Sequence, residues 1–157
     1  MTEIERKFLV KGTAYREQAH RRMEMVQGFL SRDPLRTIRI RRMGDRGWIT
    51  VKGKTTDGGT TRMEWEYEIP PAEADALLRL CLPDPIRKVR YEVPFGGHLF
   101  EVDEFDGENR GLVLAEIELT SSDQAFDKPE WLGQEVTGRP EYYNSQLSKN
   151  PYSQWNK

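Results

Sequence analysis

Acidic and basic side chains alternate at the start of the chain in a pattern that could support phosphate chemistry. Glu3, Glu5 and Lys7 lie two residues apart, and the β-branched Ile4 between them favours a strand, which we predict over residues 2–10. Side chains two residues apart in a strand point to the same face. Two carboxylates and an ammonium on one face could hold divalent cations and an anion together, although the solvent face of an ordinary edge strand often carries the same alternation.

The composition restricts the classes of protein to which this chain can belong. Its 157 residues suit a single domain, which we expect to span residues 1–157. The 24 basic and 26 acidic residues give a net charge of -2, so no overall positive field recruits nucleic acid. Cys81 is the only cysteine, which fits a reducing compartment, and no apolar run approaches the ~20 residues of a membrane helix. We therefore expect a cytoplasmic protein that has neither a nucleic-acid nor a membrane partner.

The same alternation of charged and apolar residues recurs along most of the chain. It predicts further strands over residues 26–31, 36–43, 48–54, 62–69, 86–94, 99–105 and 112–120. Helical propensity or spacing predicts helices over 14–25, 72–82 and 141–149. About eight short strands with tight connections favour an α+β, mainly β fold, a closed eight-stranded antiparallel β-barrel with flanking helices that is wide enough for one ligand.

Charged residues of one sign gather on particular strands, which bears on the face that lies inside the barrel. The basic set is Arg39, Arg41, Lys52, Lys88 and Arg90, and the acidic set is Glu64, Glu66, Glu101, Asp103, Glu116 and Glu118. Exposed cross-strand pairs contribute only about 0.2–1 kcal/mol, a weak reason for such sorting, whereas buried charges must be paired or must coordinate a ligand. We predict that the charged faces line the interior and that the helices cover the opposite faces, which carry Trp65, Tyr67, Ile40 and Ile117. A barrel with an apolar interior and a salt-bridged exterior is the alternative.

The order of these motifs resembles the CYTH superfamily of triphosphate tunnel metalloenzymes. The matching segments are Glu3-Ile4-Glu5-Arg6-Lys7, Arg39-x-Arg41, Lys52, Arg62-x-Glu64-x-Glu66, Lys88-x-Arg90, Glu101-x-Asp103, Glu116-x-Glu118, Val136-Thr137-Gly138 and Tyr143-Asn144. The chain is most similar to the short bacterial members that hydrolyse inorganic triphosphate. The resemblance implies a closed tunnel in which basic residues grip a linear triphosphate and acidic residues hold divalent metal.

The resemblance also implies a role for each charged position. The expected substrate-binding residues are Lys7, Arg39, Arg41, Lys52, Arg62, Lys88 and Arg90. The expected metal-binding residues are Glu3, Glu5, Glu64, Glu66, Glu101, Asp103, Glu116 and Glu118. Among these, we expect Lys52, Glu5 and Glu116 to take part in catalysis. Ligands that are all oxygens suit Mg²⁺ or Mn²⁺, whereas His20, His98 and Cys81 do not form a zinc set.

Several functions use the same mode of triphosphate binding, and the sequence does not distinguish among them. One is cyclisation of ATP by a class IV-type adenylate cyclase, and another is hydrolysis of nucleoside or thiamine triphosphate. A polyphosphate- or nucleotide-binding module without turnover is a third, but an anion binder has no use for so many carboxylates facing its ligand. In each case the partner is a small molecule that carries a triphosphate. A homodimer is compatible with the sequence, which does not define the oligomeric state, the preferred metal or the group that activates water.

Overall fold

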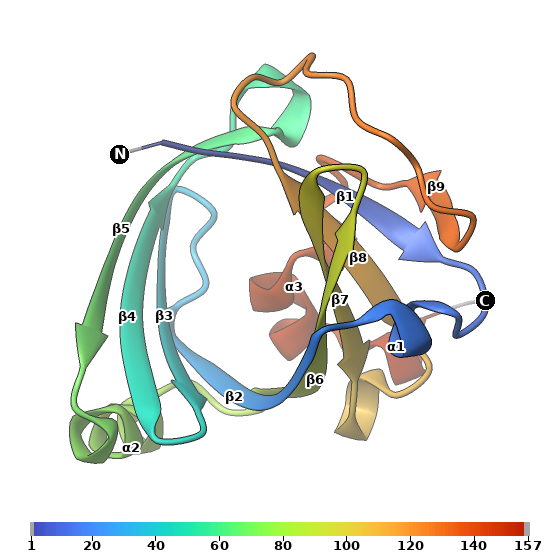
Figure 1. Cartoon of the computed structure of the whole chain (residues 1–157). Helices are drawn as coiled ribbons and strands as arrows, with labels where there is room; N and C mark the ends of the chain where they lie inside the picture. The colour runs from blue at the N-terminus through green and yellow to red at the C-terminus, as the bar shows by residue number, and fades with distance from the viewer. Residues whose placement is uncertain (1, 156–157) are drawn as a thin grey trace.

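The computed structural model describes residues 2–155, in which nine strands form one antiparallel sheet. The strands are β1 (Thr2–Val10), β2 (Arg21–Ser31), β3 (Arg36–Met43), β4 (Arg46–Gly53), β5 (Thr61–Ile69), β6 (Ile86–Phe95), β7 (His98–Phe105), β8 (Val113–Glu118) and β9 (Leu132–Glu135). The hydrogen-bonded order is β5-β4-β3-β2-β6-β7-β8-β1, and a further pairing of β1 with β5 closes these eight strands into a barrel. Figure 1 looks into the resulting ring. The closed eight-stranded antiparallel barrel predicted from the sequence is confirmed.

The first strand completes the ring by pairing with strands from distant parts of the sequence. Residues Glu5 to Leu9 of β1 pair with β8, whereas its first residues pair with β5 through the register Thr2↔Met63, Glu3↔Arg62 and Ile4↔Thr61. We call this short β1–β5 pairing the closing seam. The end of β1 also pairs with β9. Since side chains alternate along β1, the strand that closes the barrel also presents Glu3, Glu5 and Lys7 to its interior.

Three short α-helices accompany the barrel within residues 2–155. They are α1 (Tyr15–Gln18), α2 (Pro71–Leu80) and α3 (Asn144–Lys149). Single 3₁₀ turns lie at η1 (Asp57–Gly59), η2 (Gly107–Asn109), η3 (Pro140–Tyr142) and η4 (Tyr152–Gln154). Helix α2 packs on the outside of β2, β3 and β4, whereas α3 is seen within the ring of strands in Figure 1. The N-terminal end of α3 therefore reaches the interior of the barrel, where Tyr143, Asn144 and Ser145 line the cavity.

The main apolar core lies outside the barrel wall. It forms between the outer faces of β1, β6, β7 and β8 and a cover that includes Tyr15 of α1 and Trp131. The rings of Phe100 and Trp131 pack edge to face at 5.5 Å, and those of Tyr15 and Trp131 at 6.0 Å. Because hydrophobic burial takes place on the outside, the inner faces are left free to carry charged side chains.

This arrangement predicts a large effect of a truncation on the outer face of β7. Phe100 is fully buried in the core, so Phe100→Ala should lower the free energy of unfolding by about 3–5 kcal/mol. The neighbouring Leu99 is 42% exposed, and Leu99→Ala should change the free energy of unfolding by no more than about 0.5 kcal/mol. Urea unfolding of both variants measures the difference. Equal losses would mean that the core does not lie on the outer face.

The helix predicted over residues 14–25 is wrong beyond its first turn. Helix α1 ends at Gln18, and β2 begins at Arg21. Met23 and Met25 are buried and pair with Arg90 and Lys88 of β6. The Met, Glu and Arg residues of this segment favour a helix intrinsically, but pairing with two neighbouring strands outweighs that preference.

Within residues 2–155, the predicted helical cover over the outer face of β5 is absent. Ile40 and Ile117 are buried as expected, whereas Trp65 and Tyr67 are 39% and 61% exposed. The reason is that α2 packs on β2, β3 and β4, while α1 is a single turn against β6. Strand β9 was not predicted, and the helix predicted over 141–149 begins at Asn144, after the 3₁₀ turn η3. The remaining predicted strands and the helix predicted over 72–82 agree with the observed elements to within a few residues.

Candidate active site

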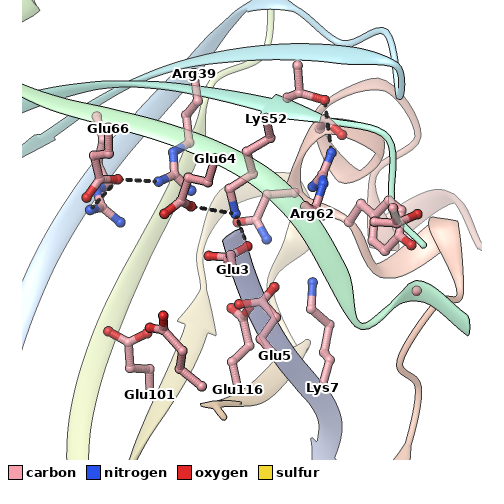
Figure 2. Close-up of a pocket in the computed structure, with 18 of the residues that line it drawn as sticks. Glu3, Glu5, Lys7, Arg39, Lys52, Arg62, Glu64, Glu66, Glu101 and Glu116 are labelled. Carbon is pink, nitrogen blue, oxygen red and sulfur yellow. Dashed lines mark hydrogen bonds and ion pairs between the residues drawn. The ribbon is translucent and has the colours of Figure 1, made fainter. Parts of the chain in front are cut away.

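The inner faces of the strands enclose a charged cavity of about 210 Å³. Its wall contains all seven of the predicted substrate-binding cations, Lys7, Arg39, Arg41, Lys52, Arg62, Lys88 and Arg90. It also contains seven of the predicted metal-binding carboxylates, Glu3, Glu5, Glu64, Glu66, Glu101, Glu116 and Glu118. Figure 2 shows many of these side chains pointing toward one another from opposite strands. The prediction that the charged faces look inward is therefore confirmed.

Lys52 links carboxylates from two strands at the closing seam. Its Nζ lies 2.8 Å from an oxygen of Glu3 on β1 and 3.4 Å from an oxygen of Glu64 on β5 (Figure 2). Burial of Lys52 opposes its charge, but the carboxylates of Glu3 and Glu5 outweigh this effect and raise its pKa. Lys52 is therefore a fixed cation in the middle of the acidic side of the cavity.

Two pairs of carboxyl groups face each other inside the cavity. Burial and the neighbouring Glu116 raise the pKa of Glu5 well above its usual range. Burial also disfavours the charge of Glu116, but Lys7 and a hydrogen bond from Glu5 lower its pKa. In the second pair, burial and the charge of Glu3 raise the pKa of Glu64 to about 7. Each pair thus holds a proton where two negative charges would otherwise repel one another.

The opposite side of the cavity has an excess of positive charge. Arg39 and Arg41 share one nearby carboxylate, with guanidinium nitrogens 3.3 Å and 3.7 Å from Glu66. Burial, followed by repulsion from Arg39 and Arg90, lowers the pKa of Arg41 to about 9. The Nε atoms of Arg39 and Arg41 are buried and have no hydrogen-bond partner in the described part of the chain. These guanidinium groups would therefore be stabilised by an anion with several oxygens.

Asp103 lies behind the cavity wall. It is 1% exposed and is not among the residues that line the cavity. Its Oδ1 accepts from Arg90 Nε at 2.8 Å, and its Oδ2 accepts from Arg90 at 2.9 Å and from Lys88 Nζ at 2.7 Å. Although burial works against its charge, Arg90 and Lys88 lower its pKa to about 2. Unlike the seven glutamates predicted with it, Asp103 supports two cations from a position outside the cavity lining.

Lys88 is a lining cation whose charge responds to mildly alkaline pH. It is almost fully buried, and this burial lowers its pKa to about 8 even though the Asp103 carboxylate raises it. Its Nζ also donates to Oδ1 of Asn144 at 2.9 Å. The environment of Lys88 thus combines residues from the barrel wall and from α3.

Several uncharged residues of the cavity were not predicted as part of the site. They are Phe29, Thr37, Thr55, Gly59, Thr60, Tyr143, Asn144 and Ser145. Thr37 could have been found because it shares the strand face of Arg39 and Arg41. Tyr143 and Asn144 belong to a segment that matched the family, but no local pattern gave them a role or indicated that this segment enters the barrel.

Two loops meet at one edge of the cavity through glycine backbones. A Cβ atom on Gly59 would lie 2.1 Å from the Cα atom of Gly138, and one on Gly138 would lie 2.3 Å from the carbonyl oxygen of Gly58. Gly59 and Gly138 also have φ angles of 96° and 78°, which residues with side chains rarely adopt. Glycine at both positions therefore allows the loop that carries Thr60 to contact the Gly138 turn.

The carboxyl pairs fit a hard divalent cation that is coordinated partly by the protein and partly by the phosphates of a bound ligand. Among residues 2–155, no three Asp, Glu, His or Cys side chains already converge into a metal-binding group. Mg²⁺ does not need such a cage, since it usually keeps several waters and binds one or two carboxylates together with substrate phosphates. The paired glutamates supply oxygens of this kind, and a cation beside them would replace the proton that each pair now holds.

This proton competition predicts how pH and metal affect stability. The pKa of Glu64 rises from 4.5 to about 7 in the folded protein, so the metal-free fold binds more protons than the unfolded chain in this range. Its stability should therefore fall as pH rises from 4.5 to about 7. We expect Mg²⁺ to raise Tm more at about pH 7.5 than at about pH 5, because protons compete less at the higher pH. Thermal unfolding in EDTA and in Mg²⁺ at both pH values measures this.

Glu64→Gln is the control for this experiment, because it removes the titrating group and should reduce the difference between the two pH values. A Mg²⁺-induced shift of Tm that is the same at both pH values would contradict the assignment of the carboxyl pairs as cation ligands.

The fold and the charged cavity define a class of barrel protein, and comparison with known families identifies that class. The model of the CYTH domain matches residues 1–151, and the chain therefore belongs to the CYTH family. The family resemblance inferred from the spacing of the charged residues is confirmed.

Individual relatives of the chain are inorganic triphosphatases by name. One from Acetivibrio thermocellus is 50% identical over 151 residues, covering 96% of this chain and 95% of the relative. One from Nitrosomonas europaea is 36% identical over 154 residues, covering 94% and 97%. A solved crystal structure of an inorganic triphosphatase is 32% identical, covers 94% of this chain and 95% of its own, and superposes with a TM-score of 0.66. In residues 2–155, none of the helices has the length and apolarity needed to cross a membrane.

Proposed function

We propose that this protein is an inorganic triphosphatase that depends on divalent metal and hydrolyses tripolyphosphate to pyrophosphate and orthophosphate inside the barrel. The observation that carries the proposal is the division of one cavity into a cation-rich side and a side of carboxyl pairs. The cavity of about 210 Å³ is smaller than the ~300–1,000 Å³ of pockets for drug-sized ligands, which favours a compact linear anion over a whole nucleotide. The names of the full-length relatives support the same substrate.

The cations of the cavity would bind and neutralise the phosphate chain. Phosphoryl transfer depends mainly on positioning and on electrostatic stabilisation of charge, so a wall of fixed cations supplies much of what the reaction needs. The planar forks of Arg39, Arg41, Arg62 and Arg90 suit pairs of phosphate oxygens, whereas Lys7, Lys52 and Lys88 supply point charges. In the reaction, a water oxygen forms a new bond to phosphorus, the P–O bond to the leaving pyrophosphate breaks, and the proton of water is released.

The glutamates of the cavity would hold Mg²⁺ or Mn²⁺. The proposed ligands are Glu3, Glu5, Glu64, Glu66, Glu101, Glu116 and Glu118. When bound, the metal supplies charge neutralisation for the phosphate oxygens and lowers the pKa of water. Lys52, Glu5 and Glu116 are the residues that we propose to act closest to the reacting atoms. Asp103 was predicted to bind metal as well, but its ion pairs suit a supporting role behind the cations.

The proposal is tested by product release from several triphosphates. Purified protein is incubated with tripolyphosphate, ATP or thiamine triphosphate, each with Mg²⁺, Mn²⁺ or EDTA, and both orthophosphate and cyclic AMP are quantified. We expect orthophosphate release that requires metal and is fastest with tripolyphosphate. Cyclic AMP formed from ATP would favour an adenylate cyclase instead. Tight binding of tripolyphosphate without turnover would mean that the protein is a binding module. Faster orthophosphate release from ATP or thiamine triphosphate would mean that the substrate is that compound and not tripolyphosphate.

The proposed setting of this activity is the cytoplasm, and the proposed assembly is a homodimer. Cys81 has a free thiol, which suits a reducing compartment.

The outer face of β5 exposes a row of large apolar side chains, Met63, Trp65 and Tyr67. Such a row supports packing against a second copy of the chain. Sedimentation velocity should give a dimer that Trp65→Ser dissociates, and a monomeric wild type would remove this part of the proposal.

A further inference from the structure

Three consecutive residues at the N-terminal end of α3 contact cations of the cavity. The carbonyl oxygen of Tyr142 accepts a hydrogen bond from Lys7 Nζ at 3.2 Å. The ring of Tyr143 lies 5.5 Å from Lys7 Nζ and 5.8 Å from Arg62 Cζ. Oδ1 of Asn144 accepts from Lys88 Nζ at 2.9 Å. One short segment therefore contacts cations from β1, β5 and β6.

The surroundings of Lys88 show what the contact with Asn144 does. An ammonium group has three hydrogens to donate. Asp103 accepts one at 2.7 Å, and Asn144 accepts a second at 2.9 Å. Apart from the ring of Phe105, whose centroid lies 5.5 Å from Nζ, the described residues offer no third partner. Lys88 lines the cavity, so the remaining hydrogen is available to an oxygen of the ligand. Asn144 is itself fixed, because its Oδ1 also accepts from Nε2 of the fully buried Gln27 at 2.6 Å.

Tyr143 contacts its two cations in a different way. The face of an aromatic ring attracts a cation within about 6 Å of the ring centroid. Lys7 and Arg62 come from strands that meet at the closing seam, and both lie within that distance of Tyr143. A flexible lysine or arginine loses side-chain entropy when it binds a ligand, and a cation already held by a ring loses less.

We propose that Tyr143 and Asn144 are positioning residues that hold Lys7, Arg62 and Lys88 in place before the substrate arrives. The inference rests on the proposed function for the identity of that substrate, tripolyphosphate. It assigns to the C-terminal segment a role in substrate affinity.

A purely structural role predicts different behaviour from these residues. Helix α3 is also anchored by contacts away from the cavity, where Gln146 Nε2 donates to the carbonyl oxygen of Arg32 at 3.3 Å and Ser148 donates to that of Asp84 at 2.6 Å. If Asn144 only fixed α3, its removal would resemble the removal of Gln146. Gln146→Ala is therefore the matched control, because it loosens the same helix without touching a cation of the cavity.

The first experiment compares Asn144→Ala with Gln146→Ala. We expect Asn144→Ala to raise KM for tripolyphosphate about 10- to 100-fold, as the loss of residues that orient a ligand group commonly does, with a smaller change in kcat. Gln146→Ala should keep KM within about twofold of the wild type. The ¹H–¹⁵N signal of the Lys88 ammonium, identified by its absence in Lys88→Arg, should be lost in Asn144→Ala and kept in Gln146→Ala.

The second experiment separates the ring of Tyr143 from its bulk. Tyr143→Leu should raise KM for tripolyphosphate about 3- to 30-fold, whereas Tyr143→Phe keeps the aromatic face and should stay near the wild type. This pair of variants carries the test if Asn144→Ala does not fold. Equal KM values for the leucine and phenylalanine variants, or a KM for Asn144→Ala no higher than that for Gln146→Ala, would overturn the inference.

The ammonium signal of Lys88 is measured without substrate, so it reports on positioning even if the proposed substrate is wrong. Absence of tripolyphosphate turnover in the wild-type protein would refute the proposed function. A Lys88 signal that persists in Asn144→Ala would refute the positioning role of Asn144.

Discussion

Glu116→Gln should lower kcat for tripolyphosphate by about 10³-fold with little change in the fold. Glu116 stays ionised in the centre of the cavity because Lys7 and the hydrogen bond from Glu5 lower its pKa despite burial. Glutamine keeps the size of the side chain but removes the negative charge, so the proposed cation site between Glu5 and position 116 should lose affinity. Phosphate release measured over a range of Mg²⁺ concentrations should show a half-saturating concentration that moves upward, with part of the rate recovered at high Mg²⁺.

Glu68→Gln is the matched control for this prediction. Glu68 lies on β5 two residues beyond Glu66 but does not line the cavity, and its exposed carboxylate pairs with Arg46 at 2.7 Å. We expect the activity and the metal requirement of the Glu68→Gln variant to equal those of the wild type. Glu116→Gln with full activity and an unchanged Mg²⁺ requirement would show that the carboxyl pair does not hold the catalytic metal.

Arg41→Ala should raise KM for tripolyphosphate by about 10²-fold or more, and kcat should fall as well. Arg41 is held over the ring of Trp48, with 5.1 Å between Cζ and the ring centroid, and it shares the Glu66 carboxylate with Arg39. Burial and the neighbouring cations lower its pKa to about 9, so its charge is costly unless an anion binds. Isothermal titration with tripolyphosphate and steady-state kinetics measure the loss of affinity and of turnover.

Two further variants make the result specific. Arg41→Lys keeps a charge but removes the planar fork, and it should recover only part of the lost affinity. Arg42→Ala removes the next arginine of β3, which points to the outside and pairs with Asp75 at 2.5 Å, and it should bind tripolyphosphate as the wild type does. If Arg41→Ala and Arg42→Ala bound tripolyphosphate equally well, the cation-rich side of the cavity would not be the phosphate site.

The strands that bear the site could be predicted because charged and apolar residues alternate along them. Arg39 and Arg41, or Glu64 and Glu66, reveal both the strand and its inner face from spacing alone. β2 broke this pattern. Its Met23 and Met25 also alternate and lie beside Arg90 and Lys88, but residues with strong helix propensity obscured the period of two.

The segment Tyr143-Asn144 matched the family, but its contacts in the site could not be predicted because they are entirely long-range. Nothing near Asn144 in the sequence indicates that its amide meets Lys88 and Gln27, which are 56 and 117 residues away. The placement of Asp103 is also a tertiary property. Its spacing from Glu101 puts it on the same strand face, but two cations enclose it at a depth where it does not reach the cavity.

The pairing of β1 has a consequence for how the protein acquires its activity during folding. Glu3 meets Arg62 and Lys7 meets Glu116 only when the first strand joins partners made much later in synthesis. Such non-local pairings raise the contact order, so we expect ring closure to be a late and slow step. Until β8 has left the ribosome, β1 lacks its main partner and the ring that encloses the charged side chains stays open. Catalytic competence should therefore arise together with the final cooperative closure of the fold.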